Sequence, residues 1–305
     1  LRPMYVDSAL LISALLFRVG QIFWNAGVSR SKNVVSAVTR QSCDAALAIV
    51  VCVIAMPFLA PEMGEDSWRI ATLASVLITT SILPLATAER STFFSNWPMT
   101  ILLAGFILPF ALGLIWTRYF PGIGAWAFLP MSCAIGAASA IASAWWIGPR
   151  PGRYHRDGSS SLFPPHQFLF VAVGAMLLNI AMVLGSLWSV SFASDSCISA
   201  LAGVGGAVLA SVIWARIRFG KVDVWSVVSG LCAGAILIPS VGLLPPWMAI
   251  LTGALAGLIG LTLSNLLDAR LHVDDAGGQS MLWLIASLLG ALVQFIHPPH
   301  ALGRP

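Results

Sequence analysis

Charged side chains are scarce in this chain. Asp, Glu, Lys and Arg make up 9% of its 305 residues, whereas a soluble globular protein carries roughly 25%. Hydrophobic residues make up 58%, and the mean hydropathy is +0.89. A chain with so little charge cannot cover a water-exposed surface of this size. The composition therefore predicts an all-α protein that crosses the membrane many times.

Motifs of catalysis and cofactor binding are also missing. The sequence has no phosphate-binding Walker loop, no HExxH, no Ser/His/Asp set and no paired carboxylates, so nothing in it argues for an enzyme or a bound cofactor. Its five Cys form no CxxC pair and lie mostly in apolar segments, where they read as small buried hydrophobes. The net charge of +4 is spread over short loops, so it predicts no nucleic-acid partner.

Apolar runs long enough to cross a bilayer recur along the chain. A span needs roughly 20 apolar residues, and ten segments approach that length. Arg18 and Gln21 weaken the first segment, and Thr and Ser weaken the third. We predict spans at 7–26, 41–60, 68–87, 97–117, 123–147, 166–189, 196–216, 224–243, 246–267 and 279–296.

A polar stretch near the middle divides these spans into two sets of five. Residues 148–158 contain three Gly and two Pro, which disfavour helix, together with Arg150, Arg153 and Arg156. This stretch is either an ordinary basic membrane loop or the joint between the halves of a repeated transporter fold. The second interpretation gives one domain with halves 1–147 and 166–296, a cytoplasmic hinge loop 148–165 and a tail 297–305.

The distribution of basic residues predicts the orientation. Eleven Lys and Arg follow odd-numbered spans, against four on the opposite side. Loops rich in Lys and Arg stay in the cytoplasm. We therefore expect the N-terminus outside the cell membrane, and with ten spans the C-terminus outside as well.

Several residues inside the spans predict helix packing. Small residues recur four apart at Gly136/Ala140/Ala144, Ala202/Gly206/Ala210 and Gly253/Gly257. They favour tight packing within one bundle over a dedicated oligomer face, because small residues let backbones approach closely. We expect Arg18 to reach the membrane surface or to pair with Asp7 or Asp44, and Asn179 and Asn265 to bond across helices.

Short motifs resemble those of the ammonium transporter (Amt/Mep/Rh) family. After the first span, residues 29–34 read Ser-Arg-Ser-Lys-Asn-Val, and residues 148–154 are similar to that family's central loop. Further matches occur in the family's order and spacing across nearly the whole chain. They are Ala88-Glu89-Arg90, Arg218-Phe219-Gly220-Lys221, Pro246-Trp247 and Asp274-Asp275-Ala276.

The resemblance implies two inverted five-helix halves, with a narrow pore through each subunit of a homotrimer in the lipid bilayer. In that family an outer aromatic and Ser site recruits ammonium, and paired His residues handle its proton while ammonia crosses. When these motifs are matched in order, the resemblance implies that the family's eleventh helix and cytoplasmic tail are missing from this sequence. A fragment, a degenerate paralogue or part of a longer fusion would each explain that difference.

The aligned pore positions depart from the family. Its two His fall on Cys133 and Trp283, and its buried Asp falls on Ala125. Its pore-facing Phe falls on Gly185, while Ser189 keeps the outer-site Ser. None of the five His lies within a predicted pore helix, so the His relay is absent. Trp283 is then either a packing aromatic or a plug in the pore.

Three functions remain open on these observations. The first is a transporter that passes ammonia or another small neutral solute along Cys133 and Trp283. The second is a non-conducting module that senses ammonium near Ser189 or regulates a partner. The third is a decayed gene product with little activity. The family resemblance favours ammonium or ammonia as the solute. The missing His and Asp favour the sensing module as the mechanism.

Overall fold

The computed structural model describes residues 4–59, 66–114, 128–155, 160–161, 163–187 and 194–297. Most of these residues are helical, and the described pairing of extended residues is one isolated bridge between Tyr154 and Ser160. The first half holds α1 (Met4–Val28), α2 (Val34–Leu59), α3 (Asp66–Ala86), α4 (Trp97–Leu102), α5 (Leu108–Leu114) and α6 (Phe128–Ile147). The second half holds α7 (Phe168–Ser186), α8 (Ser194–Phe219), α9 (Val224–Val241), α10 (Pro246–Leu271) and α11 (Ser280–Ile296).

Each predicted span overlaps a helical segment. Eight helices are long and apolar enough to cross a membrane, and two apolar segments are shorter, at Trp97–Leu112 and Ser280–Ile296. The largest boundary error is at α2, which begins at Val34, seven residues before the predicted span. The polar residues Ser36, Thr39 and Arg40 were left out of that prediction, but the Thr39 hydroxyl donates to the Val35 carbonyl oxygen, four residues earlier. Helix therefore continues through them.

A π-helical turn joins α4 to α5. The segment η2 (Leu103–Ile107) has this wider winding and runs directly into α5, which carries Pro109 at its second position. Proline lacks the N–H that an α-helix would bond to Gly105, and its ring crowds that carbonyl. The π turn relieves both problems, so the fourth predicted span is one continuous helical segment through Leu114. Residues 115–127, where this span and the fifth were predicted to end and begin, lie outside the described residues.

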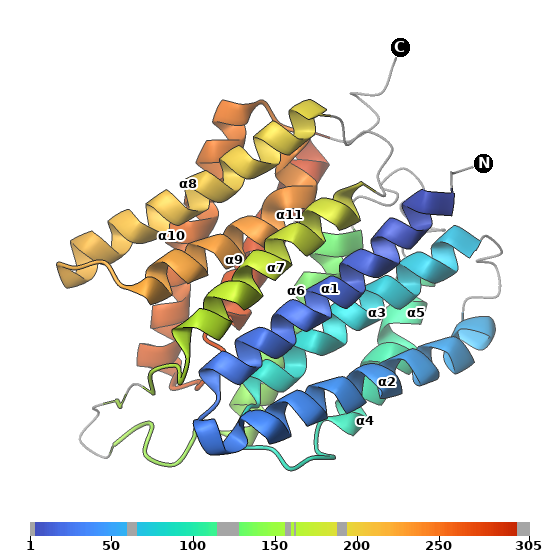
Figure 1. The fold of residues 1–305 in the computed structure, drawn as a ribbon, viewed down its shortest axis with the longest axis horizontal. Helices are drawn as coiled ribbons and strands as arrows, with labels where there is room; N and C mark the ends of the chain where they lie inside the picture. The colour runs from blue at the N-terminus through green and yellow to red at the C-terminus, as the bar shows by residue number, and fades with distance from the viewer. Residues whose placement is uncertain are drawn as a thin grey trace.

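The two sets of helices pack side by side in one bundle. Figure 1 shows α1 and α7 crossing the middle of the view, with α2 and α4 toward one side and α8 and α10 toward the other. Where α1 packs against α7, an ideal Cβ on Gly20 would lie 3.0 Å from the Gly174 carbonyl oxygen, and one on Gly174 would lie 2.7 Å from the Gly20 carbonyl oxygen. The glycine pair thus sets how closely the two sets approach.

The predicted small-residue packing is confirmed between α8 and α10. A Cβ on Gly253 would lie 1.9 Å from the Gly203 oxygen, and one on Gly206 would lie 2.3 Å from the Ile250 oxygen. Neither position accepts a side chain without backbone movement. The stripes therefore serve contacts inside the bundle.

Arg18 pairs with Asp44, one of its two predicted partners. Their side chains are buried, with Arg18 Nη2 3.7 Å from Asp44 Oδ2. Arg18 also donates to Thr80 Oγ1 at 2.8 Å and to the Gln41 carbonyl at 2.9 Å, and Thr100 donates to Asp44 Oδ1 at 2.7 Å. This network ties α1 to α2, α3 and α4. Of the two Asn, Asn179 bonds across to the Leu231 carbonyl on α9, whereas Asn265 bonds the Leu261 carbonyl of its own helix.

Candidate functional site

One face of α1 points into the centre of the bundle. Ala14, Phe17, Gln21 and Trp24 recur three and four residues apart, and each is fully buried. This spacing places their side chains on one side of a helix, one above another. Across from them stand residues of α9 and α11, so the two halves meet along a central column with three layers.

The first layer is aromatic. Phe17 and Trp283 pack with ring centroids 6.0 Å apart and a tilt of 57°. The Cys232 thiol of α9 lies beside the same indole. Phe17, Cys232 and Trp283 are all 0% exposed. The two rings and the thiol fill the column at this level.

The second layer is polar. Gln279 lies one turn before Trp283 on the same face, and its Nε2 donates to Ser229 Oγ at 3.4 Å. Gln21 lies one turn after Phe17 on α1 and is 0% exposed. Neither its amide oxygen nor its amide nitrogen has a hydrogen-bond partner. A buried amide without partners is costly and calls for an explanation.

The third layer is aromatic again. Trp24 and Trp225 have ring centroids 5.8 Å apart, and Trp24 Nε1 donates to the Gly277 carbonyl at 3.3 Å. Gly278 has a φ of +66°, and a Cβ there would lie 2.6 Å from the Trp225 ring. Only glycine therefore suits this backbone and this contact. The loop before α11 thereby seats both tryptophans.

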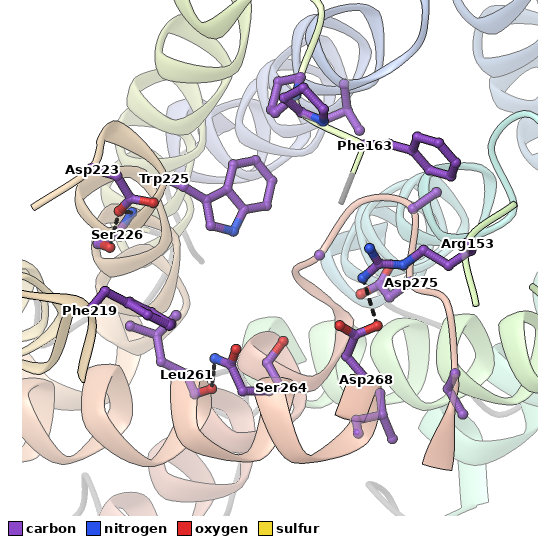
Figure 2. Close-up of a pocket in the computed structure, with 18 of the residues that line it drawn as sticks. Arg153, Phe163, Phe219, Asp223, Trp225, Ser226, Leu261, Ser264, Asp268 and Asp275 are labelled. Atoms are coloured by element: carbon purple, nitrogen blue, oxygen red, sulfur yellow. Dashed lines mark hydrogen bonds and ion pairs between the residues drawn. The ribbon is translucent and has the colours of Figure 1, made fainter. Parts of the chain in front are cut away.

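Beyond the third layer the structure opens into a cavity of ≈ 340 Å³. Its wall combines aromatic rings with carboxylates, and Figure 2 shows Trp225, Phe219 and Phe163 around it, with Asp223, Asp268 and Asp275 nearby. Val28 and Gly278 also line it, so the cavity directly adjoins the Trp24–Trp225 layer. Its position is at the face of the bundle that carries the hinge loop.

Ion pairs hold the hinge loop against the end of α10 and the loop between α10 and α11. Arg150 forms a two-pronged pair with Asp274, with Nε–Oδ2 at 2.8 Å and Nη2–Oδ1 at 2.9 Å. The Arg150 backbone N–H also donates to Asp274 Oδ2 at 2.9 Å. Arg153 and Tyr154 both donate to Asp268 Oδ1, at 2.7 and 2.6 Å. We call Arg150, Arg153, Asp268 and Asp274 the hinge clasp.

The hinge clasp changes the interpretation of these arginines. The sequence placed Arg150 and Arg153 in a basic membrane loop or in the joint between the halves, and in the structure both are buried and paired with Asp274 and Asp268. Burial by itself raises the pKa of the Asp274 carboxyl, yet the hydrogen bonds from Arg150 outweigh it and hold that pKa below its usual range. Asp274 is therefore ionised at neutral pH.

Of the five pore positions predicted by the resemblance, three fall within the described part of the chain. Cys133 is fully buried in α6, and Trp283 is fully buried in α11 against Phe17. Gly185 lets α1 and α6 approach α7, since a Cβ there would lie 2.6 Å from Ser13 Oγ and 2.9 Å from Leu129. The space that an aromatic ring would need at Gly185 is thus already filled. Ala125 and Ser189 lie outside the described residues.

Charged side chains and His are absent from the described residues of four helices around the column. The described segments of α6, α7, α9 and α11 contain no His, Asp, Glu, Lys or Arg. His155 and His166 lie in loops, and His272 and His297 follow the ends of α10 and α11. No group of three potential metal ligands occurs among the described residues.

Sequence reasoning missed the polar layer. Gln21 entered only as a weakness of the first span, and Gln279 only as the start of the last one. The i, i+4 pairs Phe17/Gln21 and Gln279/Trp283 were available signals, because each places a glutamine beneath an aromatic ring on one helix face. The pairing of those faces was not available from the sequence.

A family model described as Ammonium Transporter Family matches residues 55–298. Ammonium transporter Amt2 of Haloferax mediterranei is 27% identical over 68% of this chain and 50% of its own length. Amt1 of the same organism is 24% identical over 96% of this chain and 66% of its own. The chain thus spans about half to two thirds of these relatives.

Solved structures share the fold. A protein described as a sensor Amt protein superposes with a TM-score of 0.86 at 21% identity, over 96% of this chain and 82% of its own. Rh50 of Nitrosomonas europaea superposes with a TM-score of 0.72 at 19% identity, over 97% and 80% of the two chains. At these identities the likeness concerns the fold.

Proposed function

This chain belongs to the ammonium transporter family, and we propose that it forms a membrane path for ammonia in which Trp283 is the closed gate. The solute crosses as a neutral molecule along the central column, past Cys133, Cys232 and Trp283. Ammonium would have to leave its proton before the column, because moving an unpaired cation through the middle of a bilayer is costly.

The observation that carries this proposal is the neutral character of four helices around the column. The described parts of α6, α7, α9 and α11 offer no acid or base that titrates near neutral pH. A relay that shuttles a proton requires such groups. A path with neutral walls and one aromatic obstruction suits a small uncharged solute that passes when the obstruction moves.

The proposal includes ten membrane crossings in two inverted halves, in a homotrimer in the cell membrane with the N-terminus outside. The packing supports the repeat. α1 contacts α7 and α6 contacts α11 across the halves, while the contacts of α3 with α1, α2 and α6 recur as those of α9 with α7, α8 and α11. Pro84 and Pro239 also occupy the third-last positions of α3 and α9.

Flux measurements in proteoliposomes test the gate. Ammonia entry is followed with a pH-sensitive dye inside the vesicles, in the native chain and in Trp283→Ala. We expect faster alkalinisation in Trp283→Ala, because the smaller side chain no longer packs on Phe17. The matched control is Trp146→Ala, whose ring is 83% exposed on α6. Equal rates in all three proteins and in empty vesicles would refute the transport proposal.

A second candidate function is a non-conducting module that senses ammonium. The closed column favours it, since Phe17, Trp24, Cys232 and Trp283 are all fully buried. A combined Ala125→Asp, Cys133→His and Trp283→His variant discriminates the two. Flux in the native chain supports the transporter. Flux only in the combined variant indicates an intact scaffold with a disabled pore, which supports the sensor.

A further inference from the structure

The cavity beside the hinge loop, which we call the hinge-face cavity, is far larger than the solute proposed above. Its volume is ≈ 340 Å³, whereas a water molecule, which is close to ammonia in size, occupies about 30 Å³ in the liquid. Ligand pockets in proteins measure roughly 300–1,000 Å³. The hinge-face cavity therefore has the size of a pocket for an organic molecule.

Aromatic rings form the apolar part of its wall. Trp214 and Phe219 come from the last turns of α8 and pack edge to face, with ring centroids 5.5 Å apart. Trp225 comes from the first turn of α9. Figure 2 shows Trp225 and Phe219 at the border of the open space. Rings in such a wall cover an aliphatic stem and attract a cation at their faces.

Oxygen atoms that lack a donor form another part of the wall, on α10. Within the described residues, Ser264 makes no hydrogen bond, and the amide oxygen of Asn265 receives none. Asp268 accepts through Oδ1 in the hinge clasp, so its Oδ2 is left for another donor. Figure 2 shows the Ser264 and Asp268 side chains pointing from α10 into the open space. This face of α10 suits a ligand that carries N–H groups.

The two arginines that line the cavity are already neutralised by the protein. Arg150 forms its two-pronged pair with Asp274. Arg153 donates to Asp268 at 2.7 Å and to the Ser161 carbonyl at 2.6 Å, and its Nε lies 3.6 Å from Asp274. Neither guanidinium therefore favours an anion in the cavity.

Two lining carboxylates, in contrast, have only neutral hydrogen-bond partners. Asp223 accepts from the backbone and hydroxyl of Ser226, and Asp275 accepts from the backbone N–H groups of Gly277 and Ser280. No Lys, Arg or His nitrogen of the described residues lies within 4.0 Å of either carboxylate. Because their charges are not paired, the cavity attracts cations.

The positions of these carboxylates indicate the shape of the ligand. Figure 2 shows Asp223 on one side of Trp225, and Asp275 with Asp268 on the other. We propose that the hinge-face cavity binds a linear aliphatic diamine with both amines protonated. One ammonium group pairs with Asp223, the other lies between Asp275 and the α10 oxygens, and the stem covers Trp225. This site goes beyond the proposed ammonia path and does not depend on it.

Isothermal titration of the purified, detergent-solubilised chain with 1,6-diaminohexane at constant ionic strength tests the site. We expect saturable binding of one diamine per chain. Hexane-1,6-diol and adipate have a similar length, without charge and with the opposite charge. Neither is expected to bind, because unpaired carboxylates attract only the protonated amines. A diamine that does not bind, or a reference molecule that binds as tightly, overturns the proposal.

Asparagine variants test the two carboxylates. Asp223→Asn and Asp275→Asn keep the shape of the side chain, and we expect each to weaken diamine binding about tenfold or more, because hydrogen bonds between charged groups are the stronger kind. Asparagine caps a helix as well as aspartate does, so both variants should fold. The matched control is Asp195→Asn, an exposed residue in the first turn of α8 at the far end from Phe219, which should bind like the native chain.

The monoamine 1-aminohexane tests whether the ligand is held at both ends. The native chain should bind it about tenfold or more weakly than the diamine, because one carboxylate then stays unpaired. Equal affinities for the two amines, or a diamine affinity that is unaltered in both Asp223→Asn and Asp275→Asn, overturn the site. These titrations measure no flux, so the proteoliposome assay decides the proposed function separately.

Discussion

Replacing Asp274 by asparagine is expected to destabilise the protein by about 3 kcal/mol. The side chain is 1% exposed and receives three hydrogen bonds from Arg150, while Arg90 and Arg153 approach it at 3.9 and 3.6 Å. Removing one partner of a buried ion pair costs about 3–5 kcal/mol, because the other charge stays buried without compensation. Asparagine keeps one acceptor oxygen, so the expected loss of unfolding free energy lies at the low end of this range.

The assay is equilibrium unfolding in mixed detergent micelles, followed by tryptophan fluorescence. A loss of about 3 kcal/mol lowers the ratio of folded to unfolded protein by roughly a hundredfold. The matched control is Asp223→Asn, because Asp223 is exposed and caps α9 by accepting from the Ser226 N–H. Asparagine is an equally good cap, so this variant should change stability by no more than about 0.5 kcal/mol.

A double-mutant cycle separates the pair from the rest of the hinge clasp. Arg150→Met removes the opposite charge, and the double variant no longer buries an unpaired Arg150 or an Asp274 without its main partner. We expect the double variant to lose less stability than the sum of the two single variants, by about 1–3 kcal/mol. Additive losses, or an Asp274→Asn variant as stable as the control, would refute the reasoning.

Three further outcomes are expected. Because the pKa of Asp274 is lowered, the carboxylate contributes its full stabilisation above about pH 4 and loses it as the pH falls through the folded-state pKa. The difference in unfolding free energy between the native chain and Asp274→Asn should therefore shrink only in that acid range. A difference that stays constant with pH would contradict the lowered pKa of Asp274. Gly206→Ala should cost about 1–3 kcal/mol by forcing a Cβ against the Ile250 oxygen, whereas Gly205→Ala, which meets nothing within 4 Å, should be neutral or stabilising in the same unfolding assay. Asp44→Asn should be destabilising by about 3–5 kcal/mol because it leaves buried Arg18 unpaired, and adding Arg18→Met should restore part of that loss; no recovery would argue against the pair.

The architecture followed from local patterns in the sequence. Apolar runs bounded by Gly, Pro and charge predicted where the helices lie, because a bilayer demands about 20 apolar residues from each span whatever its neighbours are. The stripe Gly253/Gly257 predicted close helix contact for an equally local reason, since only the absence of a side chain allows it. Where the boundary was wrong, at Val34, the polar residues before the predicted span stay helical because their side chains find partners, as Thr39 does at the Val35 carbonyl and Arg40 at Ser91.

The functional site depended on contacts that no local pattern contains. Sequence alone placed Cys133 and Trp283 on the path by resemblance, and it offered Asp7 and Asp44 equally as partners of Arg18. Only the tertiary packing chose Asp44 as the partner of Arg18 and brought Arg150 to Asp274. Helical periodicity determines which face a residue occupies, but the face that it meets belongs to another helix, here up to about 260 residues away. That choice is made by the joint packing of all the helices, and therefore by the tertiary structure.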